Sequence, residues 1–371
     1  MSNRKIKVID LFAGAGGLGV GATQAGAEVC ASVELDATAC DTLRANELNH
    51  GLVIQGDVSE IEGSSLREQA KVSKGDFLIV VGGPPCQPFS KAAYWTDDGF
   101  DAAYRRARAM GHDAVRPVAK TKAKIDARRD LVQDFWRIVE ESGADGFVFE
   151  NVPSIKHPRN KPVYDALVRK ARKAGFYLQE LNAKAVDFGV AQARERVVIL
   201  GSKRGVPSVP MATHSSDPQS GLPPHVTAGE ALAPFSGHKY FEPEEIISGR
   251  WANHLFEVPP GWNYKAHTAW AGHPNPTFVT ETRFWNFLLK LSPDRPSWTI
   301  AASPGPWTGP FHWTSRRLRT AELAALQGFP NGYIIKGSRR ERVKQMGNAV
   351  PVPLARAMIA SVMATLEDYN E

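Results

Sequence analysis

The chain has 371 residues, which is enough for two domains and a sizeable hydrophobic core. Hydrophobic residues make up 43% and charged residues 23%, values that are ordinary for a globular protein. The three cysteines contain no CxxC pair and exclude a disulfide framework, and no apolar run reaches the roughly 18 residues of a membrane span. We therefore expect a cytoplasmic protein that binds no membrane, with a net charge of +6.

Short apolar runs alternate with amphipathic stretches over residues 1–201, which is the pattern of a parallel α/β sheet. In chain order, strands are predicted at 6–12, 28–35, 52–58, 77–82, 146–151 and 197–202. Helices are predicted at 37–49, 129–142 and 162–174. This part of the chain is therefore expected to fold as a Rossmann-like α/β domain.

A basic segment lies between the fourth and fifth predicted strands. Residues 105–129 hold nine Lys or Arg against two Asp, a net charge of +7, so the rest of the chain sums to −1. A solvated loop is the plain interpretation of such a run. Because the charge is concentrated in an otherwise neutral chain, a polyanion such as DNA is the alternative that we carry forward.

The composition changes after residue 201. Residues 202–320 hold 16 of the 26 prolines, seven of the nine tryptophans and seven of the ten histidines, and helical periodicity returns only at 320–327 and 352–366. We predict a catalytic and cofactor-binding domain of residues 1–201 plus 320–371, and a smaller irregular domain of residues 202–319. No metal is expected, because neither cysteines nor paired histidine spacings accompany the histidines.

A glycine-rich turn, DLFAGAGGLG, follows the first predicted strand. Its Gly14, Gly16 and Gly19 match the GxGxxG pattern, in which glycines allow a tight turn and the close approach of a cofactor. Glu34 ends the second strand, where a carboxylate can bind both hydroxyls of a ribose. Asp57 follows the third strand and could accept a hydrogen bond from an adenine amino group. Taken alone, these residues also fit a nicotinamide-dependent dehydrogenase or a purely structural turn.

The most specific segment is GGPPCQPFS at residues 82–90, which follows the fourth strand. Ligands bind at the carboxyl ends of the strands in such folds. A lone cysteine is usually a small buried hydrophobic residue, which suits Cys30 and Cys40. It suits Cys86 badly, because three prolines hold it in a stiff loop with nothing nearby to bury it. We therefore expect Cys86 to be a nucleophile.

Two further segments face the same edge of the predicted sheet. Glu150, in FENVP, ends the fifth strand, where its carboxylate could serve as an acid or could merely cap a turn. QARER at residues 192–196 leads into the last strand. Arg194 and Arg196 are two residues apart, so in an extended segment they can point the same way, toward the site or into a surface ion-pair cluster.

With these segments in this order, the chain resembles the cytosine-5 DNA methyltransferases. The likeness covers most of residues 6–201 and 295–355 and leaves the middle of the second domain unmatched. Its most specific elements are PPCQ, ENV and QxRxR, and the tail adds QGFP and GNAV. The stretch 91–128 is longer than expected for simple bacterial members, and we expect it to be an enlarged version of the loop that closes over flipped DNA.

The resemblance implies a role for each matching residue. The S-adenosylmethionine pocket would be lined by Phe12, Gly14, Gly16, Leu18, Glu34, Asp57, Val58, Pro85, Leu131, Asn348 and Val350. Cys86 would attack the base, Glu150 would bind and protonate cytosine N3, and Arg194 or Arg196 would bind O2. Contacts to DNA are expected from Gln87 and Ser90 and, in the basic segment, from Arg105, Arg106, Arg108, Lys120, Lys122 and Lys124.

The family also implies duplex DNA as the partner and a flipped-out cytosine as the reacting base. We expect a monomeric enzyme, associated with the nucleoid through DNA, that works beside a restriction endonuclease or in a related defence system. An RNA (tRNA) cytosine-5 methyltransferase and a non-catalytic DNA-binding protein on the same fold remain alternatives. The roughly 100-residue second domain and the basic segment favour DNA, and intact Cys86 and Glu150 favour an enzyme.

Overall fold

The computed structural model describes residues 4–89, 104, 107, 112–115, 126–278 and 285–367. The chain forms two compact units. Unit 1 comprises Met1–Ala183, Glu195–Met211 and Leu354–Glu371, and unit 2 comprises Lys184–Arg194 and Ala212–Pro353.

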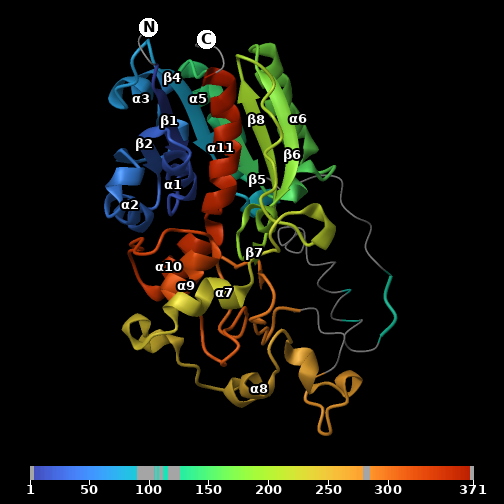
Figure 1. The fold of residues 1–371 in the computed structure, drawn as a ribbon. Coiled ribbons are helices and arrows are strands. Elements are labelled where there is room, and N and C mark those ends of the chain that lie inside the picture. The colour runs from blue at the N-terminus through green and yellow to red at the C-terminus, as the bar shows by residue number, and fades with distance from the viewer. Residues whose placement is uncertain are drawn as a thin grey trace. The chain divides into compact units, whose positions relative to one another are not determined.

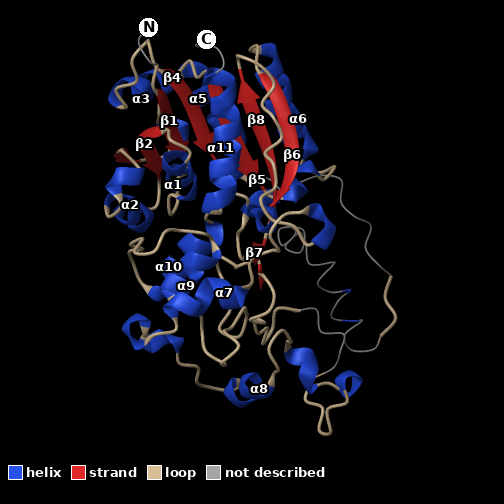
Figure 2. Ribbon diagram, viewed as in Figure 1, coloured by secondary structure: helices blue, strands red, loops and turns tan. Residues whose placement is uncertain are grey.

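Unit 1 is built on a seven-stranded sheet with the order β3-β2-β1-β4-β5-β8-β6 (Figures 1 and 2). The strands are β1 (Ile6–Leu11), β2 (Glu28–Glu34), β3 (Leu52–Gln55), β4 (Phe77–Gly82), β5 (Gly146–Asn151), β6 (Tyr177–Lys184) and β8 (Glu195–Ser202). The pairs from β3 through β5 are all parallel. Strand order reverses between β1 and β4, and such a switch point is where open α/β sheets bind ligands.

Helices cover both faces of this sheet, which makes a Rossmann-like three-layer fold (Figure 1). They are α1 (Gly17–Gln24), α2 (Ala37–Arg44), α3 (Gly63–Gln69), α5 (Leu131–Glu141), α6 (Lys161–Lys173) and α11 (Val352–Glu367). Gly21 of α1 and Gly146 of β5 lie so close to α11 that an added Cβ would come within 2.5 Å of Ala355 and 2.6 Å of Val362, respectively. Buried side chains of α3, α5 and α6 pack in one core with β1, β4 and β5.

The centre of the sheet is apolar on both faces. Every residue of β4 and β5 is buried, which explains their continuous apolar sequences FLIVVG and GFVF. Phe147 of β5 meets Phe135, Trp136 and Phe176 edge to face, with ring centroids 5.2–6.1 Å apart. This aromatic cluster holds the middle strands rigidly, so the loops that follow them start from fixed positions.

One stretch, Arg339–Glu367, is long and apolar enough by composition to cross a membrane, although 67% of its most apolar window is buried inside the protein. Its C-terminal part is α11, whose Leu354, Met358, Ile359 and Val362 are fully buried. Burial of this kind is typical of a core helix, so the helix gives weak evidence for a membrane span.

The six predicted strands are all present, but one feature of the sheet was not expected. β8 pairs antiparallel to β5, whereas the sequence pattern suggested a parallel sheet. β6 ends at Lys184 and β8, its neighbour in the sheet, begins at Glu195. The link between these two strands is too short for the crossover of a dozen or more residues that a parallel connection needs. β6 itself was not predicted, because it is an edge strand whose half-exposed residues show little apolar character.

Unit 2 contains little regular structure, in agreement with its proline-rich sequence. Its elements are a two-stranded parallel sheet, β7 (Gln192–Ala193) with β9 (Ser297–Trp298), and the helices α7 (Ala228–Leu232), α8 (Ala252–Glu257), α9 (Thr320–Leu326) and α10 (Arg339–Asn348). The predicted domain boundary at residue 320 differs from the boundary between the units, because residues 320–353 group with unit 2. Arg339 and Arg342 of α10 both pair with Glu242, at 3.0 and 3.3 Å, which ties α10 into this unit.

Candidate active site

The carboxyl ends of the central strands of unit 1 meet at one edge of the sheet. Leu11 of β1 pairs with Gly82 of β4, and Gly82 pairs with Phe149 of β5. The glycine turn after β1, the cysteine loop after β4 and the end of β5 therefore start from adjacent positions. The antiparallel register of β8 adds a fourth segment, since Asn151 lies opposite Val197.

The Glu34 carboxylate accepts a hydrogen bond from the turn after β1 and so fixes the conformation of that turn. Phe12, Gly14 and Gly16 have φ angles of 55°, 55° and 86°, a region in which the non-glycine Phe12 is strained. The backbone N–H of Gly14 donates to Glu34 Oε2 at 2.8 Å, and the N–H of Asp36 donates to Oε1 at 2.8 Å. Each carboxylate oxygen keeps a second lone pair, so the fixed, half-buried Glu34 can still accept hydrogen bonds from the two hydroxyls of a ribose.

Asp10 supports this turn from inside, a role that sequence reasoning missed. Its side chain is fully buried, and Oδ2 accepts a hydrogen bond from the backbone N–H of Gly19 at 3.1 Å. Burial, with a smaller contribution from the nearby Glu34 charge, raises the pKa of Asp10 well above its ordinary value. Asp10 thereby fixes the first turn of α1 against β1.

The remaining predicted cofactor residues of unit 1 lie in the turn after β3, in the cysteine loop and at the starts of α1 and α5. Asp57 is half-buried and begins the turn Val58–Glu60, where its Oδ1 accepts hydrogen bonds from Ser59 N at 2.9 Å and Ser59 Oγ at 2.8 Å. Val58 is buried, and Pro85 and Leu131 are half-buried. Leu18 is buried in α1. The hydrogen bonds that hold this turn use Oδ1 of Asp57, so the turn does not depend on its other carboxylate oxygen, Oδ2.

Cys86 is set apart from the other two cysteines by its surroundings. It is half-buried in the loop after β4, immediately before the turn Gln87–Phe89, and its carbonyl accepts a hydrogen bond from Phe89 N at 3.0 Å. Burial is the largest cause that raises the pKa of the Cys30 and Cys40 thiols, each to about 11. Those two thiols are therefore protonated near neutral pH, whereas the position of Cys86 suits a reacting group.

Buried polar side chains brace the loop that carries Cys86. Asn151, fully buried at the end of β5, donates from Nδ2 to the Pro84 carbonyl at 3.1 Å. Ser154 Oγ donates to the Phe89 carbonyl at 2.5 Å. Pro84 and Phe89 flank Cys86, so the backbone on both sides of the thiol is tied to the segment that follows Glu150.

Arg129 is a third brace, although it belongs to the segment expected to bind DNA phosphates. Its guanidinium lies 5.0 Å from the centre of the Phe89 ring and donates from Nη1 to Asn160 Oδ1 at 2.8 Å. Arg128 instead forms an exposed ion pair with Asp126 at 2.7 Å. Arg129 is therefore occupied within unit 1, and it is not one of the six cations of the basic segment that are expected to contact DNA.

Asn151→Ala tests the bracing of the cysteine loop. The substitution leaves the Pro84 carbonyl and the Val152 N–H, which donates to Asn151 Oδ1 at 2.9 Å, without their buried partner. We expect the free energy of unfolding to fall by about 1–3 kcal/mol, measured by urea denaturation. Asn182→Ala, at an exposed position of β6, is the matched control and should stay within roughly 0.5 kcal/mol of wild type. Equal stability of the two variants would contradict the bracing role.

Glu150 and Arg196 form a buried pair at this edge. Arg196 Nε lies 2.6 Å from Glu150 Oε1, and their side chains are only 10% and 9% exposed. Arg196 Nη1 also donates to the Glu195 carbonyl at 2.7 Å. The pair arises because β8 runs antiparallel to β5, which places Val198 opposite Glu150 and Arg196 just beyond it.

Arg194 does not join this pair. It belongs to unit 2, where it is buried and donates from Nη1 to the Gly347 carbonyl at 3.0 Å and from Nη2 to the Asn348 carbonyl at 3.5 Å. These carbonyls end α10, and a cation is favourable at a helix C-terminus. Of the two arginines, the structure thus places Arg196 beside Glu150 and Arg194 in a structural role.

The GNAV segment also lies in unit 2. Gly347 packs against the backbone of Ala302, and an added Cβ would come within 2.4 Å of it, which explains the glycine. Asn348 is exposed and Val350 is buried. Their assignment to the cofactor pocket stays a prediction from the resemblance.

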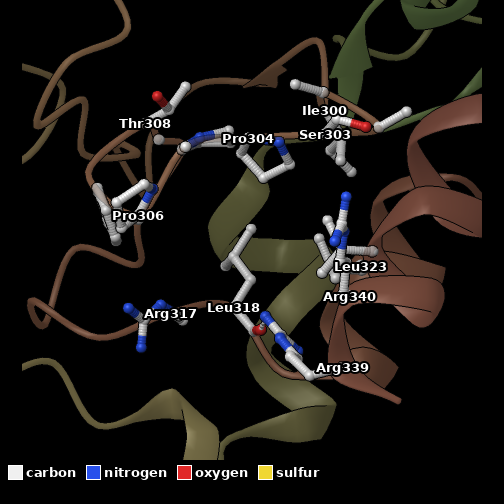
Figure 3. A pocket seen from close by; sticks show the side chains of 17 residues that line it. Ile300, Ser303, Pro304, Pro306, Thr308, Arg317, Leu318, Leu323, Arg339 and Arg340 are labelled. Atoms are coloured by element: carbon white, nitrogen blue, oxygen red, sulfur yellow. Dashed lines mark hydrogen bonds between the residues drawn. The ribbon is translucent and has the colours of Figure 1, made fainter. Parts of the chain in front are cut away.

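Unit 2 contains a cavity of about 520 Å³ that the sequence did not suggest (Figure 3). Its walls are the segment 300–311, except Trp307, together with Arg317, Leu318, Leu323, Arg339, Arg340 and Val343. Arg339 pairs with Glu242, and Arg317 donates to the carbonyls of Glu244 and Ile246. Both of these arginines therefore hold the walls of the cavity in place.

Of the residues predicted to contact DNA, the described part of the chain includes Gln87 alone. Gln87 is exposed in the turn after Cys86. Ser90, Arg105, Arg106, Arg108, Lys120, Lys122 and Lys124 lie outside the described residues.

Comparisons with known proteins agree with this geometry. The family described as C-5 cytosine-specific DNA methylase matches residues 6–364. The Type II methyltransferase M.SacI of Streptomyces achromogenes is 33% identical over 394 aligned residues, which cover 98% of this chain and 94% of that protein. M.NgoFVII of Neisseria gonorrhoeae, also a Type II methyltransferase, is 28% identical and covers 100% of this chain and 90% of its own length.

Two solved structures show the same fold. A DNA modification methyltransferase encoded within an Escherichia coli prophage superposes with a TM-score of 0.65 at 20% identity, over 99% of this chain and 100% of that one. The Dnmt2 methyltransferase of S. pombe has a TM-score of 0.55 at 14% identity, over 99% of each chain. Because the family match spans nearly the whole chain and includes every segment of the candidate site, the chain belongs to the C-5 cytosine-specific DNA methylase family.

Proposed function

We propose that this chain is a DNA (cytosine-5-)-methyltransferase that transfers a methyl group from S-adenosylmethionine to carbon 5 of a cytosine flipped out of duplex DNA. The observation that carries the proposal is the convergence of Cys86, the Glu150–Arg196 pair and the glycine turn at one sheet edge, beside the switch point between β1 and β4. A non-catalytic DNA-binding protein would need neither a braced cysteine nor a buried carboxylate–guanidinium pair beside it.

The residues of unit 1 fit the adenosine part of S-adenosylmethionine. Glu34 is held by two backbone N–H groups and retains lone pairs for the ribose hydroxyls. The position of a Cβ on Gly14 meets nothing nearer than the Phe12 carbonyl at 3.9 Å, so the face of the turn is open to a ligand. Asp57 keeps one carboxylate oxygen for the adenine amino group. When bound, the cofactor supplies a methyl group on a sulfonium, which is reactive toward a carbon nucleophile.

The protein's task is to make carbon 5 of cytosine nucleophilic. The Cys86 thiolate adds to carbon 6 while Glu150 holds a proton at N3, which converts the ring into an enamine. Arg196 keeps Glu150 in position and is near enough to its carboxylate to bind the adjacent O2 of the base. After carbon 5 has been methylated, it loses its proton, and the electron pair expels Cys86 as thiolate and restores the ring.

This chemistry requires an extruded base, since carbon 6 cannot be approached inside a stacked duplex. We propose that the irregular residues 202–319 select the target sequence, because they hold seven of the nine tryptophans and none of the proposed catalytic residues. The Type II methyltransferase relatives support a role beside a restriction endonuclease or in a related defence system. Such a role places the enzyme in the cytoplasm, on the host DNA.

Bisulfite sequencing tests the function directly. DNA from cells that express the chain should carry 5-methylcytosine at one recurring sequence, and DNA from cells that express Cys86→Ala should not. Methylated RNA with unmodified DNA would favour the tRNA-directed alternative. Unmodified DNA and RNA, together with sequence-specific DNA binding, would favour the non-catalytic one.

The basic segment gives a separate prediction about DNA affinity. Replacing Arg105, Arg106, Arg108, Lys120, Lys122 and Lys124 with Gln should flatten the slope of log K against log salt by several units. Each neutralised phosphate contributes about −0.9 to that slope. Fluorescence anisotropy at a series of salt concentrations measures K and hence the slope. Phosphate contacts carry no sequence information, so the methylated sequence should stay the same.

The control for this variant has the same change in charge at exposed positions of unit 1. It replaces Lys74, Lys161, Arg169, Lys170, Arg172 and Lys173 with Gln. Equal salt slopes in the two variants would show that the segment is a solvated loop. Arg129 is left unchanged in both, because it braces the cysteine loop.

A further inference from the structure

A cluster of potential metal ligands lies in unit 2, and none of its residues has been assigned a role above. It consists of Glu257 at the end of α8, His267 at the end of the turn Tyr264–His267, and His273 in the loop that follows. One ligand atom from each of the three residues lies within 4.8 Å of the other two.

The hydrogen bonds of His267 determine which of its nitrogens carries the proton. The residue is only 1% exposed, and its Nε2 lies 2.7 Å from the His254 carbonyl oxygen. A carbonyl oxygen can only accept, so Nε2 must carry the hydrogen. In the neutral ring, Nδ1 then presents a lone pair, and this buried atom has no hydrogen-bond partner among the described residues.

A carboxylate oxygen, which is an acceptor as well, lies close to this lone pair. Glu257 Oε2 lies 3.6 Å from His267 Nδ1, beyond hydrogen-bond distance. The His267 imidazole is buried, whereas the Glu257 side chain is 63% exposed, so a cation held between these two acceptors would be reached from the protein surface. In a tetrahedral zinc site with Zn–N and Zn–O distances of about 2.0–2.1 Å, neighbouring ligand atoms are roughly 3.3–3.5 Å apart. The observed separation is close to that value.

We propose that Glu257, His267 and His273 bind one zinc ion, with water as the fourth ligand. Two imidazoles and one carboxylate are a ligand set that zinc accepts. The hydrogen bond from His267 to the His254 carbonyl is the outer contact that fixes the ring of a metal-binding histidine in the required tautomer. His273 Nδ1 accepts the backbone N–H of Asn275 at 3.2 Å, so His273 gives up this bond, or turns its ring, when it binds the ion.

The surroundings of the cluster give the ion a structural role. Among the described residues, the adjoining hydrophobic core contains six buried residues, among them Leu255 and Tyr264, and α8 has six residues. Zinc would join the end of α8 to the loop at residues 268–273 and would hold this part of unit 2 in one conformation.

Metal analysis of the untagged chain tests the proposal. Purified without chelator, the protein should contain one zinc per chain by plasma mass spectrometry. Removing zinc with a chelator should lower the midpoint of thermal unfolding, and adding zinc back should restore it. Cobalt(II) in place of zinc should give the visible absorption bands of a tetrahedral site.

Three variants and two controls locate the ion. His267→Gln and Glu257→Gln should each weaken zinc binding by at least about 100-fold, more than the loss of an outer contact would. His273→Ala changes a half-buried loop residue, so it should lower zinc affinity without unfolding the chain. His238→Ala, at an exposed position, and Cys86→Ala should keep full zinc content, which excludes surface histidines and the proposed nucleophile as the source.

Two outcomes would overturn the site. One is a zinc-free chain whose melting temperature is unchanged by both chelator and zinc. The other is full zinc content in both His267→Gln and His273→Ala.

Discussion

Cys86→Ala is expected to abolish methyl transfer while leaving DNA binding intact. The loss should exceed the roughly 10²–10⁴-fold that a positioned acid contributes, because without the thiolate no enamine forms and carbon 5 is not a nucleophile. Single-turnover assays with labelled S-adenosylmethionine measure the rate, and fluorescence anisotropy measures DNA affinity. Methylation by Cys86→Ala at a rate near that of wild type would refute the covalent mechanism.

A duplex that carries 5-fluorocytosine at the target provides a direct view of the same step. Fluorine cannot leave carbon 5 as a proton does, so the methylated base should stay attached to Cys86 and appear as an adduct by mass spectrometry. Cys30→Ala and Cys40→Ala are the matched controls. Burial raises the pKa of both thiols to about 11, so neither is a thiolate near neutral pH, and both variants should remain active and form the adduct.

Glu150→Gln should lower the single-turnover rate by about 10²–10⁴-fold with little change in cofactor affinity. The amide keeps the size of the side chain but cannot deliver a proton to N3, and it leaves Arg196 without the opposing charge 2.6 Å away. Rates measured at saturating DNA and cofactor, together with calorimetry of S-adenosylmethionine binding, separate the two effects.

Glu195→Gln is the control for this substitution, because Glu195 is exposed and adjacent to Arg196 in the chain. It should behave as wild type in both measurements. A Glu150→Gln enzyme that turns over normally at saturation but has lost cofactor affinity would assign Glu150 to the cofactor pocket instead.

Several parts of this protein follow from the sequence alone because local chemistry decides them. β4 is apolar over its whole length and β5 over its first four residues, GFVF, as is typical of strands covered on both faces. Glycines at positions 14 and 16 predicted a turn with positive φ, and both adopt it. The family could also be identified from the sequence, because its motifs are short contiguous segments whose order along the chain is itself informative.

Tertiary structure decided everything that depends on which segments meet. The direction of β8 follows from the short link after β6, and it alone separates Arg196, which meets Glu150, from Arg194, which caps α10. Arg129 looked like one charge among nine, yet it packs on Phe89 under the cysteine loop. The sequence did not indicate the proposed zinc ligands, because they lie 10 and 6 residues apart and this spacing matches no known metal-binding pattern. Only the folded chain brings them together. The sequence predicts what neighbouring residues do together, whereas pairs of charges distant along the chain depend on strand direction and packing.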